Sequence, residues 1–265
     1  MAFEELKVRQ AAMWGSAPFE NIAHTLYDMH VTVVEALGGG AGKQWLDVGC
    51  GTGELASLAA RTGADVTGVD LSTHLVQTAR RQAREWEVDV TFDVADCESL
   101  PYEPASFDLV SSSVGAMFAP DHAAVAAELA RVCRLGGRLA MTAWIREGHI
   151  ASFFDLLDEY APSGPPEAGD PMAWGRPEHA DALPGGAFDV TTSRCDATWR
   201  SPSAEEMVDA FATGFGPLKT LLAAMPSSRG DELLGRLRAD FETYRTDDGI
   251  VMARPYTLIQ GVRRS

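Results

Sequence analysis

A short apolar stretch followed by three glycines, each one residue apart, constrains this chain more than any other feature. Residues 45–48 form the stretch, which predicts a buried strand carrying one acid, Asp47. The glycines follow directly, at Gly49, Gly51 and Gly53. Glycine adopts backbone angles that other residues resist, and it lets a ligand approach the main chain closely. Because a helical pattern begins at Glu54, we predict the opening unit of a nucleotide-binding α/β domain.

Glu54 narrows the choice of ligand. A dinucleotide-binding fingerprint would place its third glycine at this position, where the helix begins. A carboxylate there would repel a pyrophosphate. A nicotinamide oxidoreductase is therefore disfavoured, and enhanced NADH fluorescence on mixing would revive that alternative.

The pattern Asp47-x-Gly49-x-Gly51-x-Gly53 resembles motif I of the class I S-adenosylmethionine (SAM)-dependent methyltransferases. Their cofactor is cationic at sulfur and carries an amino-acid tail rather than phosphates. The resemblance implies that these four residues, together with the main chain at Cys50, fold around SAM.

A second acid follows at the interval that such domains use. Residues 64–70 predict a strand that ends at Asp70, 23 residues after Asp47. In these domains a carboxylate at this point binds the ribose hydroxyls, because it can accept two hydrogen bonds from a diol. We assign Leu71 to the same site, and we expect Ser72 to cap a helix that runs to Arg84.

Residues 95–102 resemble the third landmark of the family, an acid and a small residue before a Leu-Pro-aromatic run. By that resemblance Asp96 accepts a hydrogen bond from the adenine amino group, and the backbone at Cys97 meets the adenine ring. We expect the Cys97 thiol to pack rather than to react, because no neighbour in the sequence would lower its pKa.

The fold class follows from alternating strand and helix patterns up to residue 144. They predict a doubly wound sheet, and the helix, Gly136-Gly137 turn and strand resemble the ubiquinone/menaquinone-biosynthesis-like branch of the family. The resemblance implies a Rossmann-like α/β fold with seven strands in the order 3-2-1-4-5-7-6, the last antiparallel. We expect one domain over residues 1–265, with N-terminal helices in 1–40 and a helical substrate cap from about 146–250 interleaved with the late strands. Within the cap, residues 161–186 predict an ordered surface loop or lid.

The exit of the fourth predicted strand bears on the acceptor. Enzymes that methylate adenine or amide nitrogens usually carry an Asn/Asp-Pro-Pro-aromatic run there, whereas this chain has Ser112-Ser113-Val114-Gly115. A nucleobase acceptor is therefore disfavoured. We place Ser112 in the cofactor site, and the resemblance makes Trp14 a wall of the cofactor or substrate site.

Methyl transfer from a sulfonium is an in-line displacement that a dry, well-positioned site can support without a protein nucleophile. A phenol, enol or carbon acid would also need a base. No pattern selects among the candidates, each of which can equally be a structural residue: His24, Tyr27, His30, His122 and His149.

Composition excludes several classes of partner. The net charge of −16 argues against nucleic acid and anionic membranes. The four cysteines contain no C-x-x-C pair, so we expect no disulfide framework and no zinc site, and no cluster of His and carboxylates suggests another metal. With no signal-like N-terminus and no membrane-length apolar run, we expect a cytoplasmic protein.

These patterns together predict a SAM-dependent methyltransferase that acts on a small, largely apolar metabolite, at oxygen in preference to carbon or nitrogen. The alternative is a SAM-binding protein without transferase activity that serves as a partner or regulator. Whether the chain forms a homodimer is left open.

Overall fold

A single sheet organises the computed structural model, which describes residues 3–162 and 164–264. Its strands follow the order β3-β2-β1-β4-β5-β8-β6, and the short β7 pairs with β8 beside this path. The strands are β1 (Gln44–Val48), β2 (Asp65–Asp70), β3 (Thr91–Val94), β4 (Phe107–Ser113), β5 (Cys133–Trp144), β6 (Phe188–Ser201), β7 (Arg245–Thr246) and β8 (Gly249–Arg263). The predicted order is confirmed, with β8 in the place of the predicted seventh strand and β7 as an addition.

The first five strands are parallel, and β1 lies between β2 and β4. Trp45, Leu46 and Val48 of β1 are completely buried. A parallel sheet is covered on both faces, which explains why these side chains are apolar without alternation. In contrast, β8 runs antiparallel to both β5 and β6.

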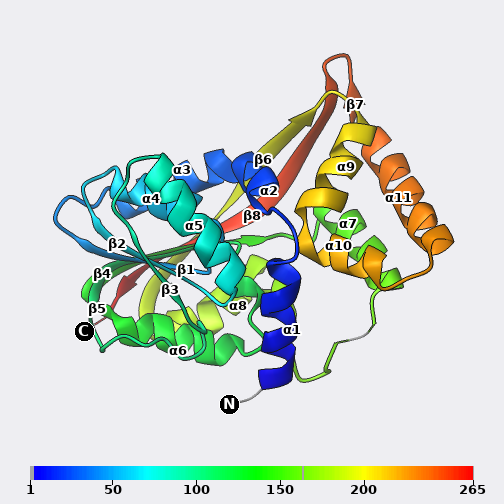
Figure 1. The fold of residues 1–265 in the computed structure, drawn as a ribbon. Coiled ribbons are helices and arrows are strands. Elements are labelled where there is room, and N and C mark those ends of the chain that lie inside the picture. Colours follow the sequence, from blue (N-terminus) through cyan, green and yellow to red (C-terminus); the bar gives the residue numbers. More distant parts are fainter. Residues whose placement is uncertain (1–2, 163, 265) are drawn as a thin grey trace.

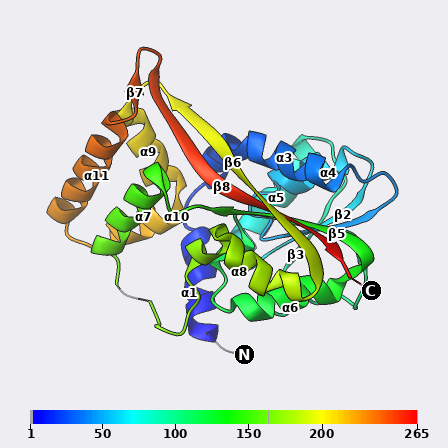
Figure 2. The same cartoon turned by 180° about the vertical axis from the view of Figure 1, so that it is seen from behind.

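Helices cover the two faces of the sheet (Figures 1 and 2). On one face lie α3 (Tyr27–Leu37), α4 (Glu54–Ala60) and α5 (Thr73–Glu85), and on the other lie α6 (His122–Val132) and α8 (Pro177–Ala182). The ordered surface loop or lid expected over residues 161–186 contains three short helices, η3 (Pro171–Gly175), α8 and η4 (Pro184–Gly186). Trp174 of η3 is completely buried and joins the main core, which orders the segment.

Four helices from the second half of the chain form a cap beside the sheet (Figure 1). It contains α7 (Gly148–Tyr160), α9 (Ala204–Gly214), α10 (Gly216–Ala223) and α11 (Ser227–Glu242), and it has its own hydrophobic core. The sequence pattern predicts one helix over 203–224, whereas the structure breaks it at Phe215. Pro217 in the first turn of α10 explains the break, since proline fits a helix start but not a helix interior.

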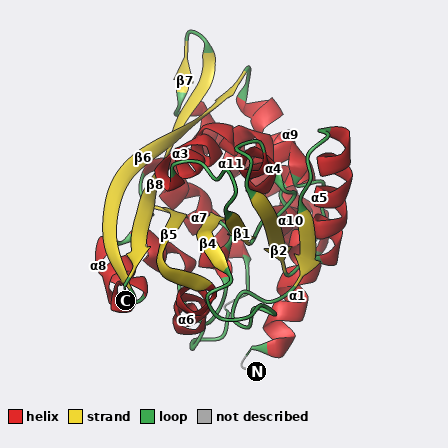
Figure 3. Cartoon of the chain, turned by 90° about the vertical axis from the view of Figure 1, so that its left-hand side faces the viewer, coloured by secondary structure: helices red, strands yellow, loops and turns green. Residues whose placement is uncertain are grey.

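A long ribbon joins the two parts. β8 pairs with β5 as far as Tyr256, and its pairing with β6 continues to Ile250. The ribbon therefore extends past the edge of β5 toward the cap, as Figure 3 shows from the side. The sequence patterns at 188–199 and 256–262 predict strands there, and the structure confirms both, with β6 and β8 longer than those patterns.

The N-terminal helices lie between sheet and cap (Figure 1). They are α1 (Glu4–Trp14), α2 (Glu20–Ala23) and η1 (His24–Leu26), and α1 contacts α10 while α2 contacts α9. The sequence Gly15-Ser16-Ala17-Pro18 predicts a break in the helical pattern, and the structure confirms it, because α1 ends at Trp14 and α2 begins at Glu20. Across residues 3–162 and 164–264, no helix combines the length and apolar character needed to cross a membrane.

Candidate active site

A cavity lies where the carboxyl ends of the parallel strands face the cap. Gly49, Asp70 and Ser113 border it from the sheet, and Phe153 and Phe211 border it from α7 and α9. This edge of an open α/β sheet is where such folds bind ligands, because the loops that follow the strands converge there. The cavity is therefore shared between the two parts of the molecule.

The glycine turn after β1 opens into this cavity. Gly49 and Gly51 have φ angles of 67° and 54°, in the left-handed region that favours glycine. A Cβ on Gly49 would lie 2.8 Å from Cα of Gly115, so the two backbones pass in contact. A Cβ on Gly51 would meet only the Phe19 ring, at 3.9 Å. Gly51 therefore marks the place where a ligand can approach the main chain.

Asp47 lies at the end of β1 and borders the cavity. It is buried, and its Oδ1 accepts a hydrogen bond from the Ser111 hydroxyl at 2.8 Å, while Oδ2 has no partner. Burial raises the pKa of Asp47 to about 7, and the bond from Ser111 opposes that rise. A buried carboxyl oxygen without a partner is completed by a cationic or hydrogen-bond-donating ligand.

Asp70 ties the glycine turn to the helix that follows β2. Its Oδ2 accepts from the backbone N–H of Gly51 at 3.0 Å, and its Oδ1 accepts from the N–H of Ser72 at 2.8 Å. Burial raises the pKa of Asp70, and these N–H groups oppose the rise. The predicted side-chain cap from Ser72 is wrong, because its Oγ has no partner. Asp70 and Leu71 both border the cavity.

Glu54 is held at the start of α4 and also borders the cavity. The Thr52 hydroxyl lies 2.7 Å from its carboxylate, and burial raises the pKa of Glu54 to about 7. Gly53, which precedes the helix, is not among the residues that line the cavity. A Cβ there would lie 2.9 Å from the Phe92 ring, so this glycine permits close packing between helix and strand.

Asp96 is paired with a lysine that the sequence patterns did not reveal. Lys7 of α1 is 4% exposed; its Nζ lies 2.6 Å from Oδ2 of Asp96 and also contacts Glu98. Lys7, Asp96 and Cys97 all border the cavity. Burial, with the neighbouring acids, raises the pKa of the Cys97 thiol well above its usual range, so the thiol stays protonated. The pair fastens α1 over the third landmark, while the adenine contact of Asp96 stays a prediction.

The other predicted cofactor residues divide. Trp14 and Cys50 border the cavity. Ser112 is buried outside the lining, where its Oγ accepts from the N–H of Ala116 at 3.0 Å. Its neighbour Ser113 borders the cavity instead, because successive side chains of a strand point to opposite faces.

Three of the five catalytic candidates lie outside the cavity lining. His24 and Tyr27 are exposed. His122 lies against His179, with 3.0 Å between its Nδ1 and the Nε2 of His179. Burial, followed by the charge of His179, lowers the pKa of His122 to about 4. These positions explain the buried His122 and the half-buried His179 as a structural pair.

His30 and His149 border the cavity. Burial lowers the pKa of His30 to about 4, and its Nδ1 has no partner. His149, at the start of α7, is 1% exposed, and its Nδ1 lies 3.5 Å from Oδ2 of Asp240 in α11. The Ser152 hydroxyl donates to the same Asp240 oxygen at 3.0 Å. Of the five catalytic candidates that the sequence did not rank, the structure therefore places two, His30 and His149, at the cavity.

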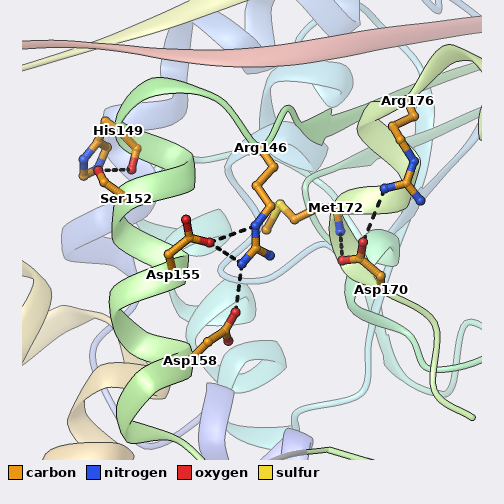
Figure 4. A network of polar contacts seen from close by, with 8 residues as sticks. All are labelled: Arg146, His149, Ser152, Asp155, Asp158, Asp170, Met172 and Arg176. Atoms are coloured by element: carbon orange, nitrogen blue, oxygen red, sulfur yellow. Dashed lines mark hydrogen bonds and ion pairs between the residues drawn. The ribbon is translucent and has the colours of Figure 1, made fainter. Parts of the chain in front are cut away.

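A charged network lies beside α7, the helix that carries His149 (Figure 4). Arg146, just before the helix, contacts Asp155 at 2.5 Å and Asp158 at 3.0 Å. In the same view His149 and Ser152 occupy the first turns of the helix, away from this network. The ion pairs are exposed, so they orient the helix end more than they stabilise the fold.

The wall of the cavity that faces the cap is aromatic. The rings come from the residue before α2 and from the cap, and they are those of Phe19, Phe153, Phe154, Phe211 and Phe215. Trp14 contacts Phe19 and Phe215 edge to face, with ring centroids 5.8 and 5.5 Å apart. One cationic side chain, that of Arg254, interrupts this wall. No local sequence signal distinguishes Arg254, Lys7 or Asp240 from ordinary surface charges.

Comparison with known proteins identifies the family. A family model described as a methyltransferase domain matches residues 46–141. The uncharacterized protein Rv1405c of Mycobacterium tuberculosis is 32% identical over 217 residues, which cover 81% of this chain and 79% of that protein. The 27-O-demethylrifamycin SV methyltransferase of Amycolatopsis mediterranei is 37% identical over 144 residues, 49% of this chain and 52% of the relative. The chain belongs to the class I SAM-dependent methyltransferases.

A solved methyltransferase shares the fold. Phosphoethanolamine N-methyltransferase 2 of Haemonchus contortus, in complex with S-adenosyl-L-methionine, gives a TM-score of 0.57 at 21% identity. The match covers 90% of this chain and 53% of that one. SAM is the cofactor of the present methyltransferase, and its described residues fit that molecule. The partnerless oxygen of Asp47 and the open space at Gly51 lie at the same end of the cavity as Glu54 and Asp70, where carboxylates favour a cation.

Proposed function

We propose that this methyltransferase transfers the methyl group to an oxygen atom of a small, largely apolar metabolite. The aromatic wall of the cavity supports an apolar acceptor, because such rings bury apolar surface and exclude water. A relative whose name specifies a 27-O-demethyl compound supports oxygen as the acceptor atom. When bound, SAM supplies an electrophilic methyl group on a sulfonium.

One observation carries the choice of oxygen: His149 borders the cavity, and its Nδ1, which makes no hydrogen bond, lies 3.5 Å from Oδ2 of Asp240. A neutral hydroxyl is a weak nucleophile, so a phenol or enol needs a base within reach. With Nδ1 facing the Asp240 carboxylate, Nε2 of His149 takes the hydroxyl proton, and the carboxylate stabilises the imidazolium that forms. His30 serves less well, because its lowered pKa makes it a weak base.

The surrounding rings complete the arrangement. The ring of His149 lies 5.7 Å from that of Phe153 and 5.3 Å from that of Phe241, measured between centroids. This packing holds the imidazole in place and keeps water from the acceptor. The chain's own contribution is thus to position, to exclude water and to hold one proton.

Label transfer tests the proposal directly. The protein is incubated with methyl-labelled SAM and a panel of fused-ring phenols and the matching arylamines, and mass spectrometry locates the label. We expect the label on oxygen. In a panel member that reacts, His149→Asn should lower kcat by about 10²–10⁴-fold, the usual contribution of a general base, with SAM affinity unchanged.

His24→Asn is the matched control, because His24 is exposed and outside the lining of the cavity. Label found on nitrogen alone, or full activity in His149→Asn, would contradict the proposal. If SAM bound while no panel member gained label, the alternative of a SAM-binding protein without transferase activity would gain support.

A further inference from the structure

Arg254 is a buried cation at the side of the cavity that faces the cap. It lies on β8, opposite Ala197 of β6, in the part of the ribbon that extends past β5. The residue is 3% exposed and borders the cavity. Its guanidinium lies over the indole rings of Trp144 and Trp199, at 5.6 and 5.3 Å from the ring centroids.

The protein offers this guanidinium only neutral oxygen atoms. Nη1 donates to the Thr25 hydroxyl at 3.0 Å, Nη2 donates to the Thr25 carbonyl at 2.5 Å, and Nε lies 3.5 Å from the Ala197 carbonyl. Within residues 3–162 and 164–264, no Asp or Glu lies within ion-pair distance of Arg254. A guanidinium has five N–H groups, so these three contacts leave N–H groups for another acceptor.

Lys7 shows what a buried cation normally receives in this protein. It borders the same cavity, and two carboxylates, those of Asp96 and Glu98, compensate its charge. Burial lowers the pKa of Arg254 to about 10, so its side chain is still charged at neutral pH. A buried charge without a partner is costly, and the cost is removed when a ligand supplies the counter-charge.

We infer that Arg254 binds an oxyanion on the methyl acceptor, so that the acceptor is an apolar molecule carrying a carboxylate or an enolate-type oxygen. The planar guanidinium matches two oxygen atoms in one plane, and Trp144, which also borders the cavity, accepts the apolar part beside it. This inference rests on the proposed function for the identity of the ligand as an acceptor. It adds the chemical class that the cavity selects.

The competing interpretation is that Arg254 only fastens the ribbon to Thr25. Both interpretations use the same hydrogen bonds, so a stability measurement alone would not separate them. The two interpretations differ in the ligand affinities that they predict. An arginine that only fastens the ribbon would give an acid and its neutral isostere the same affinity. The experiment therefore compares ligands first and variants second.

The probes are 2-naphthoate and 2-naphthamide, which share one shape and differ in charge. Each is titrated calorimetrically into the full chain saturated with S-adenosylhomocysteine, and benzoate and benzamide repeat the comparison at smaller size. We expect each acid that binds to do so at least about 10-fold more tightly than its amide, the scale of hydrogen bonds to a charged group. Equal affinities, or no binding by either acid, would overturn the inference.

Variants then assign the preference to one side chain. Arg254→Gln should reduce the preference to less than about 2-fold, because the charge that distinguishes the probes is gone. Arg200→Gln is the matched control, since Arg200 lies on the same ribbon but is exposed. Thr25→Val should keep the preference, because it removes a contact of Arg254 without removing its charge. A preference that persists in Arg254→Gln would overturn the inference.

Folding is checked in each variant by its melting temperature and by binding of S-adenosylhomocysteine. If Arg254→Gln does not fold, Arg254→Lys is used instead, because it keeps the charge but loses the planar fork. The ratio of acid affinity to amide affinity should then fall below the wild-type ratio, with the acid still binding more tightly than the amide. A Lys variant with an unchanged preference would overturn the role of the fork. If S-adenosylhomocysteine itself fails to bind the wild type, the cofactor assignment fails, and titration of the free protein still measures the effect of Arg254.

Discussion

The cofactor end and the acceptor end of the cavity differ in charge and in origin. The cofactor end carries Asp47, Asp70 and Asp96 at or just after the ends of strands, and Glu54 at the start of α4. The acceptor end carries aromatic rings, His149 and Arg254, from the cap and the ribbon. The difference teaches that separate parts of one fold can give the two ends of a cavity different character. The end beside the strands is acidic, with Lys7 already paired to Asp96 and Glu98, whereas the end beside the cap is aromatic and carries a buried arginine without a carboxylate partner.

The largest effect that we expect tests whether the two parts have separate cores. Leu237 of α11 is completely buried in the core of the cap. Leu237→Ala should lower the free energy of unfolding by about 2–5 kcal/mol through lost burial and a cavity. Urea unfolding measures that loss, and Leu234→Ala, which is partly buried on the same helix, should lose less. A SAM affinity that fell in step with stability would argue against the separation.

At the cofactor end, Asp70→Ala should weaken SAM binding by about 1–3 kcal/mol, the scale of hydrogen bonds to a charged group. The carboxylate also holds the N–H of Gly51, so the variant loosens the glycine turn as well. Calorimetric titration with SAM measures the change. Asp65→Ala, at the exposed start of the same strand, serves as control. An unchanged affinity in Asp70→Ala would remove this acid from the site.

The charge of the cofactor end should depend on pH. Burial raises the pKa of both Asp47 and Glu54 to about 7, so both carboxyls are largely protonated at pH 6 in the free protein. We expect SAM affinity to rise about tenfold between pH 6 and 8, one pKa unit of differential interaction. S-adenosylhomocysteine lacks the sulfonium charge and should change less. Calorimetric titration of both ligands between pH 6 and 8 measures these affinities. Equal pH profiles for the two ligands would contradict a charge interaction between the sulfonium and these carboxylates.

The same raised pKa values predict the direction of a stability change. The folded state binds these two protons more tightly than the unfolded chain does. The contribution of the two groups is therefore complete below about pH 4, and it is lost as pH rises through about 7. Asp47→Asn should reduce this loss in the cofactor-free protein.

The smallest expected effect is on the free energy of unfolding, and it compares glycine-to-alanine substitutions in the cap and in the glycine turn after β1. Gly235 lies within α11, and a Cβ there would meet nothing within 4 Å. Gly235→Ala should raise the free energy of unfolding by about 0.5–1 kcal/mol, because alanine loses less backbone freedom in a helix. Gly49→Ala should lower it, since the new Cβ would lie 2.8 Å from Gly115. Thermal melting of both variants measures the two signs, and equal signs would contradict the contrast.

The sheet and the cofactor end were predictable because their signals are local. Asp47, the glycine turn and Asp70 lie at the ends of apolar runs, and parallel strands bring such ends to one edge. Nothing local marks Arg254, since its surroundings depend on the pairing of residues 250–255 with β6, which is distant in the sequence. Likewise His122 and His149 both lie in the first turn of a helix, so the local sequence does not distinguish them. They differ only in their tertiary contacts, because His122 packs against His179 and His149 borders the cavity.

The β6–β8 ribbon has a mechanical consequence. A cap attached only through flexible linkers could swing open on its own, but two paired strands run from the sheet to the side of this cap. Movement of the cap away from the sheet therefore requires the β6–β8 ribbon to bend or twist. Arg254 lies on this ribbon beside Trp144 and Trp199, so any bending of the ribbon also moves the guanidinium at the side of the cavity.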